Sequence, residues 1–212
     1  MYTPRHFAID DPAQLHEFMR AHSFATLVTH GPGGLDANHV PLLVRGSEGS
    51  ERLAGHVARA NPLWEDHADE HVLCLFQGPD HYISPSAYPT KAETGKVVPT
   101  WNYTAVHARG ILRVIEDRDW LHALVSELTH THEADQAAAW KVTDAPDDYI
   151  EAMLGAIVGI EIEVTELVGK WKLSQNQPAK NRDGVVRALS GGDEAARAMA
   201  DLVARTGRGS GE

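Results

Sequence analysis

The chain has 212 residues and a mass of 23.1 kDa, with 42% hydrophobic and 23% charged residues. This balance is typical of one globular domain, or one and a half, and excludes a disordered, collagen-like or coiled-coil chain. The formal net charge of −11 disfavours general nucleic-acid binding, because phosphate contacts need Lys and Arg. A single cysteine, Cys74, excludes an internal disulfide framework and a four-cysteine metal site. No apolar run approaches the ~20 residues of a membrane-spanning helix, and the start of the chain lacks an apolar signal core. We therefore expect a soluble cytoplasmic protein.

The predicted elements are short strands and helices that follow one another along the chain. Strands are indicated by alternating apolar and polar side chains, and helices by apolar residues three and four apart behind a capping residue or proline. In chain order, we expect a helix opened by Asp10-Asp11-Pro12, strands at Ser23–His30, Leu35–Arg45 and Arg52–Ala58, a short helix opened by Asn61-Pro62, strands at His71–Gln77 and Tyr103–Glu116, helices at Asp117–His130 and Asp147–Leu154, a strand at Ile157–Val164, and helices at Val185–Leu189 and Glu194–Arg205.

Turn and loop signals indicate how these predicted strands and helices are connected. Gly31-Pro32-Gly33-Gly34 is a strong turn signal between the first two strands. Pro41 predicts an edge position, a bulge or a break in the second strand, because proline donates no ladder hydrogen bond. The segment from Tyr82 to Thr100 is rich in Pro, Ser and Gly and is too long for a passive connection, which is typical of a functional loop. Thr206–Glu212 is expected to fray.

Strands of hairpin character without regular crossover helices argue against a doubly wound parallel sheet. The expected fold class is mainly β with peripheral helices (α+β), as a six-stranded antiparallel β-barrel, which also removes exposed sheet edges. We expect residues 1–168 to form the barrel domain with inserted helices. Residues 169–212 would form a C-terminal segment with helices packed on the barrel.

The C-terminal part differs from the rest in charge. Residues 169–208 hold eight basic and four acidic residues, so this stretch is +4 and the remainder −15. A solvated helix face with a tail is the simpler explanation, and local attraction to a phosphate group is the other. No helix-turn-helix is evident, because Glu194–Arg205 lacks a partner helix at the spacing that this motif needs.

Motifs for several kinds of chemistry are missing from the sequence. It has no G-x-S-x-G elbow, no phosphate-binding G-x-x-x-x-G-K-[ST] loop and no G-x-G-x-x-G fingerprint after a strand. Cys74 lies mid-strand, which indicates a buried and inert thiol. Among 13 histidines the densest group is His130-x-His132-Glu133 at a helix end, where a protonated histidine suits the helix dipole. Ligand spacings for a metal are absent, so we expect no metal site. The catalytic residues stay undetermined.

Four segments combine cations, amides and flat rings. They are Asn38-His39-Val40-Pro41, the segment from Gly55 to Pro62, the segment from Val98 to Tyr103, and the segment from Gly169 to Asn176. Arg59 ends a strand just before a helix, so a phosphate could use the guanidinium and the helix N–H groups together. An exposed arginine on a turn and aromatic plugs in the core are the alternatives. Jointly the segments predict a site for a planar heterocycle with a phosphate tail.

These segments, with others, resemble the PaiB family, described as FMN-binding negative transcriptional regulators. The shared motifs, which span nearly the whole chain, are Met1-Tyr2-x-Pro4-x-x-Phe7, His39-Val40-Pro41-Leu42, Gly55-His56-Val57-Ala58-Arg59-Ala60-Asn61-Pro62, Tyr82-Ile83-Ser84-Pro85-Ser86, Val98-Pro99-Thr100-Trp101-Asn102-Tyr103 and Trp171-Lys172-Leu173-Ser174-Gln175-Asn176. The resemblance implies an FMN-binding split barrel of the pyridoxamine-phosphate-oxidase-like type. Such proteins are usually homodimers with two flavin sites at the subunit interface.

The resemblance also implies a set of FMN-binding residues. They are His39, Val40, His56, Arg59, Asn61, Thr100, Trp101, Asn102, His107, Trp171 and Gln175. Arg59 is placed like the cationic phosphate ligand of split-barrel flavoproteins, although it stands nearly alone as a basic residue there. His39, Val40 and His56 would line the cleft beside the flavin.

The remaining residues of this set would cover and close the site. Thr100, Trp101 and Asn102 would come from the partner subunit and cover the ring system, with His107 on the following strand. Trp171 and Gln175 would close the site. A donor at the N1–C2 carbonyl edge of the flavin would stabilise its reduced anion, and His56, Asn102 or Lys172 could serve.

Several functions are compatible with this sequence. The leading expectation is a homodimeric FMN-binding protein that acts as a negative transcriptional regulator or as a flavin-dependent redox protein with a small-molecule partner. Whether it is an FMN-dependent oxidoreductase stays open, and regulation could be indirect, without DNA contact. One alternative is a DNA-binding repressor without flavin that uses the +4 region. Another is a haem-binding split barrel, which a Soret-type band would reveal.

Overall fold

The computed structural model describes residues 1–206, so the expected fraying of Thr206–Glu212 falls, beyond Thr206, outside the described residues. The chain divides into two compact units, each built from several stretches. Unit 1 comprises Met1–Phe18, Gln77–Val106 and Val168–Glu212, and unit 2 comprises Met19–Phe76 and His107–Leu167. The expected division into residues 1–168 and 169–212 cuts the chain once, whereas these units alternate along it.

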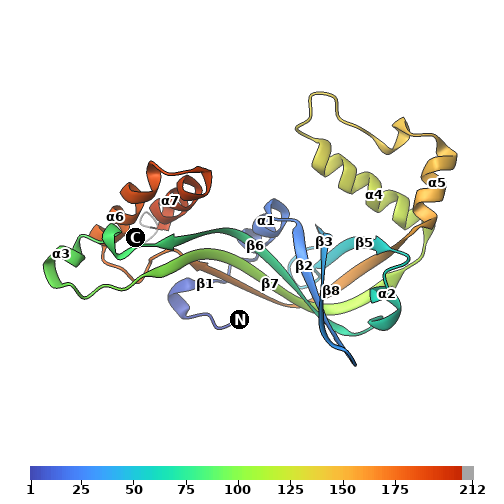
Figure 1. Ribbon diagram of the computed structural model, residues 1–212. Coiled ribbons are helices and arrows are strands. Elements are labelled where there is room, and N and C mark those ends of the chain that lie inside the picture. Colours follow the sequence, from blue (N-terminus) through green and yellow to red (C-terminus); the bar gives the residue numbers. More distant parts are fainter. Residues whose placement is uncertain (207–212) are drawn as a thin grey trace. The chain divides into compact units, whose positions relative to one another are not determined.

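The strands form one sheet with the order β3-β2-β6-β7-β8-β5-β4 (Figure 1), and β6, β7 and β8 each have residues in both units. The strands are β2 (Phe24–Gly31), β3 (Gly34–Pro41), β4 (Leu43–Arg45), β5 (Arg52–Ala58), β6 (His71–Ile83), β7 (Thr100–Ile115) and β8 (Ile157–Lys172). The β2–β3, β2–β6, β4–β5 and β5–β8 pairs are antiparallel. Within residues 1–206 the hydrogen-bonded path does not close on itself. The mainly β fold with peripheral helices is confirmed, as an open, split antiparallel sheet.

Proline explains why the structure has more strands than expected. The predicted strand Leu35–Arg45 divides, because β3 ends at Pro41 and β4 begins at Leu43. A two-residue strand, β1 (Ala8–Ile9), pairs with β8 and brings the sheet to eight strands where six were predicted. The break that Pro41 predicted is therefore confirmed, and it lets the chain pass from one end of the strand order to the other within one residue.

Helices cover part of the unit 2 sheet. They are α2 (Leu63–Asp66), α4 (Arg118–Glu133), the 3-10 turn Val142–Asp144 and α5 (Asp147–Gly155). Asp117 caps α4 by accepting a hydrogen bond from the backbone N–H of Trp120 at 2.8 Å, which satisfies one of the free donors of the first turn. The apolar side of α4 packs Leu124 and Leu128 against Leu43 and Ala54. The three helices predicted in this region are confirmed as α2, α4 and α5.

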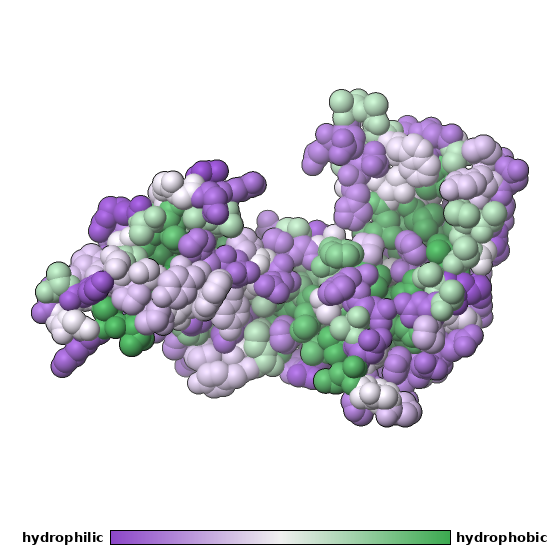
Figure 2. All heavy atoms as spheres, viewed as in Figure 1, coloured by the Kyte–Doolittle hydropathy of each residue, from purple (hydrophilic) through white to green (hydrophobic). Residues whose placement is uncertain are grey.

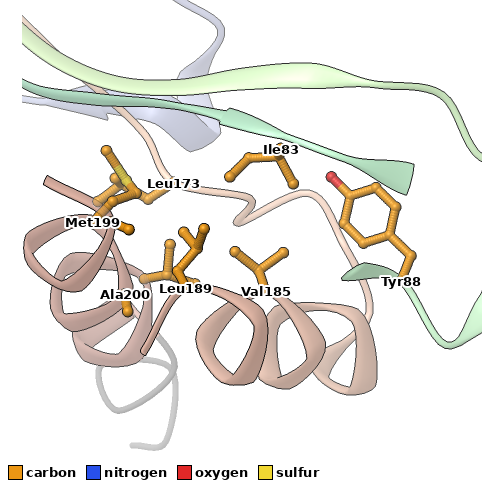
Figure 3. Close-up of a cluster of buried hydrophobic side chains, with 9 residues drawn as sticks. Ile83, Tyr88, Leu173, Val185, Leu189, Met199 and Ala200 are labelled. Atoms are coloured by element: carbon orange, nitrogen blue, oxygen red, sulfur yellow. The ribbon is translucent and has the colours of Figure 1, made fainter. Parts of the chain in front are cut away.

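Unit 1 contains β1, the second half of β6, the first half of β7 and the end of β8, together with most of α1 (Pro12–Ala21). Its other helices are the 3-10 turns Arg5–Phe7 and Pro85–Ala87, α3 (Thr90–Thr94), α6 (Ala179–Ser190) and α7 (Glu194–Thr206). Figure 3 shows Val185 and Leu189 of α6 and Met199 and Ala200 of α7 in one cluster with Leu173. This apolar cluster, which also includes Ile83 and Tyr88, is the core that holds the C-terminal helices in place.

Two expectations about unit 1 were wrong. Strands β6 and β8 run to Ile83 and Lys172, well past the predicted ends at Gln77 and Val164, and β7 begins at Thr100. In addition, α7 does have a neighbouring helix, because α6 ends at Ser190 and α7 begins at Glu194, and the two pack against each other. No helix of the described residues is long and apolar enough to cross a membrane.

Candidate functional site

The first candidate site lies in unit 2, where β5 ends. We call Asn38, Arg59, Asn61, Trp64 and Glu116 the strand-end cluster. The Arg59 guanidinium donates hydrogen bonds to the carbonyl oxygens of Gly155 at 3.0 Å and Ile157 at 3.2 Å. It also donates to a Glu116 carboxylate oxygen at 2.8 Å and lies 5.7 Å from the ring centre of Trp64. Its side chain is 40% exposed, so its remaining N–H groups are open to a ligand.

Asparagine amides fix the neighbouring backbone of the strand-end cluster. The Asn61 side-chain oxygen accepts a hydrogen bond from the backbone N–H of Leu63, the first residue of α2, at 2.9 Å. Its amide nitrogen donates to the Asn38 side-chain oxygen at 2.7 Å, which ties the start of α2 to β3. The Trp64 indole N–H donates to the Arg59 carbonyl at 3.0 Å. Arg59 and Asn61, two of the predicted FMN-binding residues, thus each have hydrogen-bonded partners at the end of β5.

The predicted histidines differ in their surroundings. The exposed His39 ring shares a hydrogen bond with the Thr26 hydroxyl at 3.1 Å and lies 6.1 Å from the Phe24 ring. His56 is half-buried, its Nδ1 is buried without a hydrogen-bond partner among the described residues, and burial lowers its pKa. Burial also lowers the pKa of His107. Val40, by contrast, is a core residue, 3% exposed.

The second candidate site lies in unit 1, on one face of its sheet. We call Tyr82, Trp101, Tyr103, Lys170 and Lys172 the aromatic–lysine face. Trp101 and Tyr103 lie two positions apart in β7, and Lys170 and Lys172 lie two positions apart in β8. The two side chains of each pair therefore point to the same side of their strand. Trp101 is 54% exposed and Tyr82 46% exposed, and their rings pack edge to face at 5.9 Å. The Lys170 ammonium lies 5.2 Å from the ring centre of Tyr103.

Both lysines of the aromatic–lysine face donate to neutral oxygens. The Lys172 ammonium donates to the Thr100 hydroxyl and, at 2.8 Å, to the Trp101 carbonyl oxygen. The Lys170 ammonium donates to the Tyr2 carbonyl oxygen at 2.9 Å. Burial lowers the pKa of Lys172, and the nearby Lys170 acts in the same direction, whereas Tyr103 opposes it. The result is a face with two ammonium groups and three aromatic rings.

The other unit 1 residues of the predicted site have structural partners. Asn102 is fully buried. Its amide nitrogen donates to the Ser174 hydroxyl oxygen at 3.0 Å, and that hydroxyl donates to the Asn102 amide oxygen at 3.2 Å. The Gln175 side chain donates to the Trp171 carbonyl and accepts from the Leu173 N–H, both at 2.6 Å. It therefore stabilises the turn after β8. The Trp171 ring packs against Phe18, with 4.7 Å between ring centres.

The predicted residues thus fall into two groups. His39, Val40, His56, Arg59, Asn61 and His107 belong to unit 2, and Thr100, Trp101, Asn102, Trp171 and Gln175 belong to unit 1. Sequence reasoning missed Glu116, Tyr82 and Lys170. Tyr82 lay inside a quoted motif, and Glu116 ended a predicted strand, but neither position alone signals a ligand. No group of three or more potential metal ligands gathers within residues 1–206.

The chain is similar to known proteins in sequence and in fold. Residues 1–166 match the protein family described as "Putative FMN-binding domain". The chain is 32% identical over 206 residues to "Protease synthase and sporulation protein PAI 2" of Bacillus subtilis, covering 96% of each protein. It is 34% identical over 208 residues to protein AN0679 of Emericella nidulans, covering 82% of each. Among solved structures it is similar to the flavocytochrome Anf3 of Azotobacter vinelandii, with a TM-score of 0.59 at 13% identity, covering 80% of this chain and 72% of that one.

Proposed function

Because the chain belongs to the FMN-binding family that it matches over residues 1–166, we propose that it is a homodimeric flavin-dependent redox protein of the PaiB type. In this proposal it acts in the cytoplasm and represses transcription indirectly, through redox chemistry. FMN is the cofactor, and when bound it supplies electron or hydride transfer. The chain's own residues bind and orient it and set the charge around it.

The residues of the two candidate sites fit such a cofactor. Arg59 is anchored to two backbone carbonyls yet keeps N–H groups open, which suits a phosphate at the end of β5. The buried, unpartnered Nδ1 of His56 is a polar atom without a role in the described fold. Trp101 and Tyr82 supply exposed flat surface for a ring system. A phosphate ligand, a polar contact and a stacking surface are what a phosphorylated heterocycle needs.

A second copy of the chain is the proposed partner. Along β2, Ala25 and Leu27 face the core, whereas Phe24, Thr26 and Val28 point to the opposite side. Phe24 is 70% exposed there, and Leu35 on the neighbouring β3 is 76% exposed. Figure 2 shows hydrophobic side chains at the surface around the β2–β3 hairpin. Phe24 and Leu35 lie at opposite ends of this hairpin, and exposed apolar residues along an open sheet face suit a protein–protein interface. In the homodimer, Thr100 and Trp101 of one protomer would cover the flavin held by its partner.

The pair of exposed rings, Trp101 and Tyr82, is the observation that carries this proposal. It is tested by titrating the purified protein with FMN and following flavin fluorescence, with Trp101→Ala as the variant. Light scattering on the same sample should give a mass of twice 23.1 kDa. We expect one FMN bound per chain and weaker binding by Trp101→Ala. A monomer, or a protein that leaves FMN free in solution, contradicts the proposal, and a Soret-type band would favour haem instead.

Direct reading of DNA by the α6–α7 pair has little support in its side chains. Arg182 donates to the Gln177 carbonyl at 2.8 Å and Arg197 to the Gly192 carbonyl at 2.6 Å, while Lys180 pairs with Glu93. Lys180 is thus paired with a carboxylate, and the net charge of −11 disfavours binding to DNA phosphates. We therefore favour indirect regulation, and a gel-shift assay at moderate salt tests it: specific retention of an operator fragment by the flavin-free protein would favour the repressor alternative.

A further inference from the structure

The aromatic–lysine face carries positive charge that pairs with no carboxylate among residues 1–206. Within residues 1–206 no ion pair joins Lys170 or Lys172 to a carboxylate, although the chain has a net charge of −11. Arginines of unit 2, such as Arg52 and Arg113, are each paired with acidic side chains. Two ammonium groups without a counter-charge, beside exposed aromatic rings, indicate a place for a flat anion.

Of the two lysines, Lys172 has the geometry to meet a ligand. Lys170 is 7% exposed and is enclosed by the rings of Tyr2 and Tyr103. Lys172 is half-buried, and its bonds to the Thr100 hydroxyl and the Trp101 carbonyl hold the ammonium at the start of β7. Those two acceptors leave a further N–H of the ammonium unused. The cation is thus fixed at the segment that presents the exposed Trp101 ring.

Two other side chains could supply a donor to the flavin's N1–C2 carbonyl edge, and their surroundings argue against both. Asn102 is fully buried, and its amide is engaged with Ser174. His56 is held toward its neutral form, because burial lowers its pKa, so it brings no positive charge. Lys172 alone of these three combines a charge with partial exposure.

We propose that Lys172 is the cation that stabilises the anionic reduced form of FMN, by placing its ammonium at the N1–C2 carbonyl edge of the ring. This inference rests on the proposed function, because it requires FMN at the aromatic–lysine face. Lys172 contributes little to holding the oxidised, neutral ring and much to holding the reduced anion. Its chief effect is therefore on the reduction potential of the bound flavin.

The environment of Lys172 suits this role physically. Partial burial removes water that would otherwise screen the charge, so its attraction for an anion is stronger than at an open surface. The same burial lowers the pKa of Lys172, and an arriving anion would offset that effect by favouring the protonated form. Lys170 and Tyr103 are the titratable groups that influence Lys172 on this face.

The test is the two-electron reduction potential of bound FMN, measured by equilibration with a reference dye in the full-length protein. We expect Lys172→Gln, which keeps a hydrogen-bond donor but removes the charge, to weaken binding of reduced FMN relative to oxidised FMN by at least about tenfold. That change corresponds to a potential lower by about 30 mV. Lys172→Arg, which keeps the charge, should retain most of the wild-type potential.

A matched control and distinct outcomes complete the test. Lys180→Gln removes an exposed lysine of the same unit that pairs with Glu93, and it should leave the potential unchanged. If the wild-type protein binds FMN and Lys172→Gln keeps its potential, the role of Lys172 is refuted while the proposed function stands. If the wild-type protein binds no FMN, the proposed function fails and this inference with it. Far-ultraviolet circular dichroism checks that Lys172→Gln is folded, and Lys172→Met offers a second charge-free variant.

Discussion

Replacing Glu116 with glutamine is expected to tighten FMN binding, whereas replacing its partner Arg59 with alanine is expected to weaken it. The reason lies in the 2.8 Å ion pair between the two side chains. If Arg59 holds the phosphate of FMN, the Glu116 carboxylate competes for the guanidinium and repels the phosphate. Glutamine removes the negative charge but can still accept a hydrogen bond, so the position of Arg59 should be kept.

The size of the effect follows from simple electrostatics. At a separation of ~8 Å and an effective dielectric constant of ~40, two unit charges interact by about 1 kcal/mol. Removing one repulsive charge should therefore lower the FMN dissociation constant about fivefold. Losing charge-assisted hydrogen bonds of ~1.5–3 kcal/mol in Arg59→Ala should raise it at least about tenfold. The Arg59–Glu116 pair is exposed, with side chains 40% and 57% accessible, so breaking it costs at most about 1 kcal/mol of unfolding free energy.

The assay is fluorescence titration of FMN at low ionic strength, repeated at higher salt to screen the charges. Glu127→Gln is the matched control, because Glu127 pairs with Arg45 elsewhere in unit 2, and it should not change FMN affinity. Unchanged or weaker binding by Glu116→Gln, together with unchanged binding by Arg59→Ala, would refute the phosphate role. Arg59 would then serve only to join the backbone at Gly155 and Ile157 to the end of β5.

Three further predictions concern stability. Gly184→Ala should lower the unfolding free energy by about 1–3 kcal/mol, because the added Cβ would lie 2.1 Å from a backbone carbonyl oxygen. Gly191→Ala is the control, since a Cβ there has nothing within 4 Å and should change the unfolding free energy little. Thermal melts of both variants measure the difference. Asn102→Ala should cost about 1–3 kcal/mol, and adding Ser174→Ala should cost less than the sum of the single changes, as a double-mutant cycle would measure. Burial lowers the pKa of His56 from 6.5, so the unfolded chain binds its proton more tightly. Stability should therefore fall as the pH drops below about 6.5 in urea titrations, less steeply in His56→Gln.

Local signals predicted those parts of the fold that neighbouring residues determine. Pro41 is the last residue of β3, because proline donates no ladder hydrogen bond. Asp117 caps α4 through a bond to the backbone N–H of Trp120 in the first turn of that helix. The same reasoning placed β2 and β3 on either side of a glycine-rich turn. In each case the controlling interaction spans a few residues, so the sequence contains it directly.

The extensions of β6 and β8 could not be predicted in this way. Each extension contains a glycine that is needed for close packing against residues distant in the sequence. Gly78 reads as a turn residue, yet a Cβ there would lie 2.5 Å from the Thr104 hydroxyl and 2.7 Å from the Phe18 ring. Gly169 is similar, since its Cβ would lie 2.3 Å from a Leu15 methyl group. Both positions need glycine for close packing inside a continuing strand, not for a turn.

The candidate sites were likewise predictable only in part from the sequence. Motifs identified Arg59, Trp101 and the segment around Lys172, because the residue types suit a phosphorylated ring. The hydrogen-bond acceptors of the Arg59 guanidinium lie 57 to 98 positions away along the chain, and no local pattern links them to it. Whether those partners leave the guanidinium free for a ligand is decided by the fold alone.

The cations of the two candidate sites share one feature that bears on how they function. Arg59, Lys170 and Lys172 are each held by backbone carbonyl oxygens, at 2.8 to 3.2 Å. A carbonyl dipole fixes the position of a cation but leaves its net charge intact, whereas a carboxylate cancels it. Held in this way, the two lysines stay available to an anionic ligand. Glu116 is the exception, since it places a full negative charge beside Arg59. For that reason, removing Glu116 should strengthen binding at the strand-end cluster, whereas removing the charge of Lys172 should weaken the hold on the reduced ring.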